Sequence, residues 1–160
     1  MKADMNGINE KVVQKLIEKS MTISAAESCT GGLFSALITE TAGASAVLEE
    51  SIVTYSNEAK MRELGVNKET LDTVGAVSRE TASQMCVGIS KHTGSDIGIG
   101  ITGIAGPDGG TKEKPVGTVF AGINIKGEAE VYELHLDGNR EQVREKTCKI
   151  VFEKLYEKIK

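Results

Sequence analysis

The chain has 160 residues and a mass of 17.0 kDa, the size of one domain, so a single domain over residues 1–160 is expected. Its net charge of −4 and aromatic content of 4% argue against nucleic-acid binding, which favours a basic face or aromatic stacking platforms. No apolar stretch approaches the roughly 20 residues that cross a membrane, and residues 1–10 lack an apolar signal core, so a cytoplasmic protein is expected.

Strands and helices alternate through the first part of the chain. Residues 8–19 have apolar side chains at helical spacing and predict an amphipathic helix. A short apolar strand at 21–26 leads into a polar turn and then a helix at 33–38. A second strand at 51–55 is followed at once by a helix at 58–64. Each strand therefore ends in a polar segment that begins a helix.

The same alternation continues into the middle of the chain. A short helix is expected at 67–71 with Asn67 as its cap, and Ser78 begins a longer helix that extends to about residue 91. A strand at 97–101 then leads into a glycine-rich loop that ends at Gly110.

The last part of the chain predicts a hairpin and a closing helix. Strands at 116–125 and 130–136 are joined through Lys126-Gly127, and residues 139–159 have the pattern of an amphipathic helix. Strands that alternate with helices, together with one hairpin, predict an α/β fold. We expect a three-layer α/β/α sandwich around a mostly parallel mixed sheet.

The first segment whose spacing suggests chemistry is residues 26–32, AESCTGG. Ser28 follows a strand and precedes a helix that opens with two glycines. Backbone N–H groups at a helix N-terminus favour an anion or a developing oxyanion, so Ser28 is a candidate nucleophile. The alternative is that Ser28 or Thr30 is an ordinary helix N-cap.

The second segment is residues 54–60, TYSNEAK, where another strand end leads into a helix. With Ser56 or Asn57 as the cap, Lys60 falls in the first helical turn, at the unfavourable end of the helix dipole for a cation. If Lys60 is also desolvated, its pKa falls, as a neutral general base requires. The alternative is a solvated surface lysine.

The third segment is residues 102–110, TGIAGPDGG, at the carboxyl end of a strand, where ligands of α/β sheets collect. Its four glycines suit a backbone cradle for phosphate or ribose, although an ordinary long loop is equally compatible. The overlapping G-x-G-x-x-G pattern that starts at Gly98 is rejected as a dinucleotide site. Its first two glycines lie inside the strand, and a Pro/Gly loop follows where a helix is required.

The sequence offers few ligands for a metal ion. Cys29, Cys86 and Cys148 are widely separated and form no C-x-x-C pair, and the only histidines are His92 and His135. We therefore expect no disulfide framework, no metal site and no cofactor.

Together, the three segments resemble one family, the CinA C-terminal domain or PncC-type nicotinamide-nucleotide amidase. The resemblance spans roughly residues 8–158. The larger CinA proteins have an additional N-terminal nucleotide-handling domain, so this chain resembles the stand-alone form. The residues that carry the resemblance are 26–32 (AESCTGG), 53–60 (VTYSNEAK), 75–78 (GAVS), 102–110 (TGIAGPDGG) and 114–119 (KPVGTV).

The resemblance implies deamidation of nicotinamide mononucleotide to nicotinate mononucleotide and ammonia. It implies that Ser28 is the nucleophile, that Lys60 is the base, and that Tyr55 relays or orients a proton. Arg140 resembles the family's Gly-x-Arg element and would bind the phosphate, although a surface arginine at a helix start is an alternative. The expected substrate contacts are Cys29, Thr30, Gly31, Thr102, Gly103, Gly106, Gly109 and Arg140.

Two other functions remain open at this point. One is a non-catalytic nucleotide-binding module with a regulatory role linked to competence or DNA damage. The other is a thiol enzyme that uses Cys29, although neither histidine lies near a plausible partner motif. A homo-oligomer is compatible with either.

Overall fold

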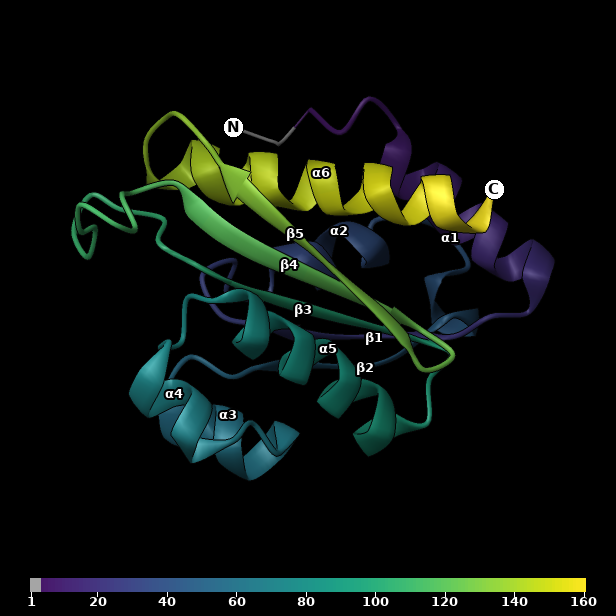
Figure 1. Cartoon of the computed structure of the whole chain (residues 1–160). Helices are drawn as coiled ribbons and strands as arrows, with labels where there is room; N and C mark the ends of the chain where they lie inside the picture. The colour runs from purple at the N-terminus through teal and green to yellow at the C-terminus, as the bar shows by residue number, and fades with distance from the viewer. Residues whose placement is uncertain (1–3) are drawn as a thin grey trace.

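The computed structural model describes residues 4–160 and places a five-stranded sheet between two layers of helices (Figure 1). The strands are β1 (Ile23–Glu27), β2 (Leu48–Val53), β3 (Ile97–Gly103), β4 (Thr118–Ile125) and β5 (Glu128–His135). The helices are α1 (Ile8–Lys19), α2 (Leu33–Thr39), α3 (Asn57–Leu64), α4 (Lys68–Thr73), α5 (Arg79–Thr93) and α6 (Arg140–Ile159), with a 3-10 turn η1 at Ala44–Ala46. Within the described residues, no helix is both long and apolar enough to cross a bilayer.

The strand order in the sheet is β2-β1-β3-β4-β5. β1 pairs in parallel with both β2 and β3, whereas β4 is antiparallel to both β3 and β5. Four strands therefore point the same way, and β4 alone runs against them. The prediction of a mostly parallel mixed sheet in a three-layer sandwich is confirmed.

The two faces of the sheet carry different helices. α1, α2 and α6 pack together on one face, and α3, α4 and α5 cover the other (Figure 1). β3 is buried because it lies mid-sheet and is covered on both faces. A Cβ at Gly98 would lie 2.2 Å from the Cys86 carbonyl oxygen, and one at Gly100 would lie 2.6 Å from the Cys86 nitrogen. These glycines allow α5 to pack directly on the strand, which accounts for them without a dinucleotide.

Several predicted boundaries shift by a few residues. β2 begins at Leu48 because pairing with β1 starts there, and the exposed Glu49 and Glu50 of this edge strand conceal the pattern in the sequence. β4 begins at Thr118, after Gly117 with φ +92°. Asn67 occupies the N-cap position of α4, but its side chain makes no capping hydrogen bond.

Candidate active site

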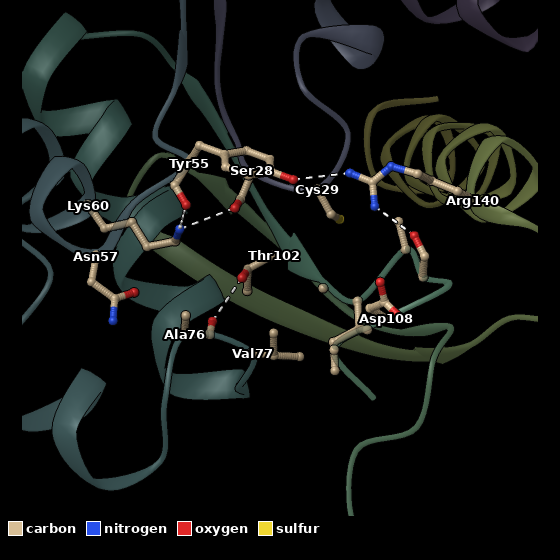
Figure 2. Close-up of a pocket in the computed structure, with 15 residues that line it drawn as sticks. Ser28, Cys29, Tyr55, Asn57, Lys60, Ala76, Val77, Thr102, Asp108 and Arg140 are labelled. Carbon is tan, nitrogen blue, oxygen red and sulfur yellow. Dashed lines mark hydrogen bonds between the residues drawn. The ribbon is translucent and has the colours of Figure 1, made fainter. Parts of the chain in front are cut away.

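A cavity of about 270 Å³ opens where β1, β2 and β3 end (Figure 2). Its walls come from the turns after these strands, the segment before α5, the loop after β3 and the first residue of α6. The strands are parallel, so their carboxyl ends bring three distant polar segments to one edge of the sheet. The sequence-predicted residues that line this cavity are Ser28, Cys29, Tyr55, Lys60, Thr102, Gly103, Gly106, Gly109 and Arg140.

Ser28 lies immediately after β1, and its backbone N–H donates to the carbonyl oxygen of Ile101 in β3 at 3.0 Å. This bond extends the β1–β3 ladder by one residue and fixes the serine at the end of the strand. The side chain is 8% exposed and reaches the cavity. Ser28 is not a helix cap, because α2 begins five residues later, at Leu33, with Gly32 at the N-cap position.

Lys60 approaches Ser28 from α3. The Ser56 hydroxyl caps this helix by accepting from the Ala59 amide at 3.0 Å, which leaves Lys60 in the first turns of α3. Lys60 is 1% exposed, and its Nζ lies 3.2 Å from Ser28 Oγ. It also donates to the carbonyl oxygen of Thr54 at 2.8 Å, so the alternative of a solvated surface lysine is wrong.

The environment of Lys60 disfavours its charged form. Burial lowers the pKa of Lys60 below its ordinary value of 10.5. Within residues 4–160, no carboxylate forms an ion pair with Lys60 that would offset this desolvation. Its hydrogen-bond partners are the Ser28 hydroxyl and the carbonyl oxygens of Thr54 and Tyr55, none of which carries a charge.

Tyr55 lies in the same cavity wall, and its phenol hydroxyl is directed to Arg140 (Figure 2). The side chain is 61% exposed because β2 is an edge strand, and its hydroxyl accepts from Arg140 Nη2 at 3.1 Å. Only its backbone carbonyl, 3.5 Å from Nζ, contacts Lys60. Tyr55 therefore contacts both ends of the cavity with different atoms.

Arg140 is the first residue of α6, a helix that Asn139 and Gln142 cap reciprocally. Its guanidinium donates to the Gly106 carbonyl oxygen at 2.7 Å as well as to Tyr55. Arg140 therefore joins the glycine-rich loop to the end of β2 across the cavity mouth.

Two side chains hold the walls on the far side of the cavity. The Thr102 hydroxyl donates to the Ala76 carbonyl oxygen at 2.8 Å, and Lys114 donates to the carbonyl oxygens of Val74 and Val77. The loop after β3 is thereby bonded to the segment before α5.

Thr30 and Gly31 do not line the cavity, contrary to expectation. Thr30 is fully buried, and its hydroxyl donates to Glu27 Oε1 at 2.5 Å. Gly31 has φ +59°, so it serves the turn itself. Both residues stabilise the turn after Ser28 and lie behind it.

Glu27 stabilises the site, and the sequence analysis did not identify it. Its fully buried carboxylate accepts from the backbone amides of Phe34 and Ser35 and from the hydroxyls of Thr30 and Ser35. The expectation that helix-start amides face the substrate is therefore wrong, because Glu27 occupies those of α2. A glutamate inside an apolar strand, three residues before a threonine, is the signal that could have indicated it.

Arg144 was missed as well. It lies one helical turn after Arg140 and donates through Nε to the Cys29 carbonyl oxygen at 3.2 Å and through Nη2 to that of Thr30 at 2.7 Å. The i, i+4 spacing from Arg140 places both arginines on one face of α6 and is the signal in the sequence.

The thiol of Cys29 has the wrong protonation state for a nucleophile. Burial, and then the negative charge of Glu27, raise the pKa of Cys29 to about 12. The thiol-enzyme alternative is thus disfavoured. Among residues 4–160, no three His, Cys, Asp or Glu side chains are grouped as a metal site would require.

The sequence model of the CinA C-terminal domain matches residues 5–159. A relative from Clostridium novyi, named for competence-damage induction, is 54% identical over 140 residues, which are 88% of this chain and 34% of that protein. A CinA-like protein from Kosmotoga olearia is 51% identical over 87% of this chain and 34% of its own length. The chain thus spans about a third of these relatives.

Solved structures agree over nearly the whole chain. The competence/damage inducible protein CihA from Agrobacterium tumefaciens has a TM-score of 0.93 and 39% identity, covering 97% of this chain and 95% of that one. A CinA superfamily protein from Klebsiella pneumoniae has a TM-score of 0.94 and 35% identity, covering 98% of each chain. The chain belongs to the CinA C-terminal domain family.

Proposed function

We propose that this chain hydrolyses the carboxamide of nicotinamide mononucleotide to nicotinate mononucleotide and ammonia, without a metal. The observation that carries the proposal is the buried Lys60 amine 3.2 Å from the Ser28 hydroxyl. A serine needs an adjacent base to attack an amide, and a lysine acts as that base when its pKa is lowered. The three free, buried cysteines fit a reducing, cytoplasmic compartment.

The partners of Lys60 allow it to accept a proton from Ser28 when it is neutral. A neutral amine has two N–H donors and one lone pair. The carbonyl oxygens of Thr54 and Tyr55 can only accept, so they take the two N–H groups. Lys60 Nζ donates to Ser28 Oγ as well. When Lys60 is neutral, Ser28 is the one partner of the three that can donate, so its proton can then turn toward the lone pair of Lys60. This arrangement prepares Lys60 to act as a base.

The reaction proceeds in two halves. Ser28 Oγ attacks the carboxamide carbon while its proton passes to Lys60, and the Lys60 ammonium then protonates the amide nitrogen. The C–N bond breaks, ammonia leaves, and an acyl ester remains on Ser28. A water then gives a proton to Lys60 and attacks the ester. Lys60 returns that proton to Ser28 Oγ, and nicotinate mononucleotide departs.

The oxyanion needs a donor other than the first amides of α2. The Cys29 amide follows the nucleophile directly, as the oxyanion donor does in strand–serine–helix turns of other hydrolases. Cys29 lines the cavity, and no oxygen in residues 4–160 accepts from its amide. We assign the Cys29 N–H to the oxyanion.

The far end of the cavity is assigned to the nucleotide. Arg140 would exchange the Gly106 carbonyl for the substrate phosphate, to which a guanidinium binds in a bidentate manner. Tyr55 holds Arg140 through its phenol and contacts Lys60 through its carbonyl. We therefore assign Tyr55 an orienting role and no relay of protons.

The test is release of ammonia and nicotinate mononucleotide by the purified chain, with Ser28→Ala and Lys60→Met as controls. Activity should persist in EDTA, and activity that zinc restores after loss in EDTA would contradict a metal-free mechanism. Tight binding of the nucleotide without turnover would instead support the non-catalytic regulatory module.

A further inference from the structure

The turn that carries Ser28 is held by a guanidinium that does not line the cavity. Arg144 is half-buried on α6 and donates to the carbonyl oxygens of both Cys29 and Thr30. Within residues 4–160 it forms no ion pair with a carboxylate. Its donors are therefore directed to the backbone of the turn.

The hydrogen bond from Arg144 to the Thr30 carbonyl is connected to the Cys29 amide through two planar peptide groups. Arg144 holds the carbonyl end of the Thr30–Gly31 peptide, and the N–H end of the same peptide belongs to Gly31. That N–H donates to the Ser28 carbonyl oxygen at 3.0 Å. The Ser28 carbonyl and the Cys29 amide belong to one peptide group, Ser28–Cys29. Because each peptide group is planar, this hydrogen bond couples the orientation of the Thr30–Gly31 peptide to that of the Cys29 N–H.

We propose that Arg144 is a positioning residue, which holds the Cys29 amide in register with Ser28 for the developing oxyanion. This inference rests on the proposed function, because it assumes that Ser28 is the nucleophile. Arg140, one turn earlier on the same helix, contacts the substrate end of the cavity instead. Substitution of Arg144 should therefore lower kcat, whereas substitution of Arg140 should raise KM.

The experiment compares Arg144→Met with Arg140→Met on nicotinamide mononucleotide. Loss of one oxyanion donor costs ~10²–10³ in kcat, so a misplaced donor should lower kcat in Arg144→Met by roughly 10–100-fold. Its KM should stay within about threefold, because the contact acts mainly in the transition state. Arg140→Met should show the reverse pattern.

Two further variants separate positioning from loss of structure. Arg144→Lys keeps the charge but cannot bond both carbonyls in a fork, so its kcat should lie between those of the wild-type chain and Arg144→Met. Millimolar guanidinium should restore part of the kcat of Arg144→Ala. A generally loosened fold would instead lower the melting temperature without rescue, and this result would overturn the inference.

A second readout does not depend on the natural substrate. A fluorophosphonate reacts when Ser28 Oγ forms a bond to phosphorus, fluoride leaves, and the serine proton passes to Lys60. Mass spectrometry should show slower labelling of Ser28 in Arg144→Met, with Ser28→Ala unlabelled at this position. Equal labelling rates and equal kcat would overturn the inference.

The two readouts also separate this inference from the proposed function. A wild-type chain that is labelled but releases no ammonia would refute the proposed substrate, while the labelling rates would still decide the role of Arg144. A wild-type chain that does neither would refute the nucleophile, and with it both proposals.

Discussion

The buried carboxylate of Glu27 accepts four hydrogen bonds beside the Ser28 turn, and Glu27→Gln tests how much they stabilise the chain. Each carboxylate oxygen accepts one backbone amide and one hydroxyl: Oε1 binds Phe34 and Thr30, and Oε2 binds both groups of Ser35. A glutamine must place its NH₂ at one of the two positions. The hydroxyl at that position can rotate and accept from the NH₂ group, but the backbone N–H, which only donates, loses its acceptor.

The expected loss of stability follows from these four hydrogen bonds. A hydrogen bond to a charged group contributes about 1.5–3 kcal/mol, and the three remaining bonds weaken when the charge is lost, so the free energy of unfolding should fall by about 2–4 kcal/mol. For a chain of this size, that corresponds to a decrease in melting temperature of about 4–16 °C. Since typical domains have about 5–15 kcal/mol in total, the variant should still fold.

Urea titration and thermal unfolding measure this change, with Glu128→Gln on the exposed part of β5 as the matched control. Ammonia release should fall in Glu27→Gln at temperatures where the variant remains folded, because Ser28 directly follows this residue. A decrease in stability below about 1 kcal/mol, the contribution of one ordinary hydrogen bond, would refute the reasoning.

Four further predictions follow from the charges and contacts of the site. The kcat/KM should rise with pH through an apparent pKa below 10.5, and Lys60→Arg should be nearly inactive over the whole profile, because a guanidinium cannot accept the proton. Because burial lowers the pKa of Lys60, the unfolded chain binds more protons than the folded chain between that lowered pKa and 10.5. The unfolding free energy measured in urea should therefore decrease as the pH falls through this window. Lys60→Met should flatten this pH dependence. In steady-state kinetics, Arg140→Ala should raise KM with less effect on kcat, and nicotinamide riboside should be a poor substrate. Equal catalytic efficiency on the riboside would contradict a phosphate-binding role for Arg140. Ser28→Ala should lose at least ~10³-fold in kcat and Cys29→Ala should retain most activity, with mass spectrometry locating any acyl adduct on Ser28; an adduct on Cys29 would contradict the mechanism.

Local patterns in the sequence were sufficient for the elements and their order. Apolar spacing in the amphipathic helices and strands, the Ser78 cap, the choice of Ser56 or Asn57 as the cap of α3, and the Lys126-Gly127 hairpin each depend on residues close together in the chain. Alternation of strands and helices then leaves few ways to bury both faces of a sheet, so the sandwich was predictable. The segments around Ser28, Lys60 and the glycine-rich loop were identifiable for the same reason, because each is a polar segment at a strand end.

Only the tertiary structure decided which of these residues meet. Ser28 and Lys60 are 32 positions apart, and the parallel pairing of β1 with β2 brings their segments together. A longer separation conceals the role of Arg144, which reaches the Ser28 turn from α6 across 114 positions.

The remaining differences arise from exposure and competition for hydrogen bonds. Tyr55 follows an edge strand, so its phenol turns outward to Arg140. Glu27 takes the amides of α2 that were expected to face the substrate. The sequence alone therefore determined the fold class and the segments that form the site. The direction of each side chain depended on strand order and on which donor was already bonded, because these follow from packing between distant segments.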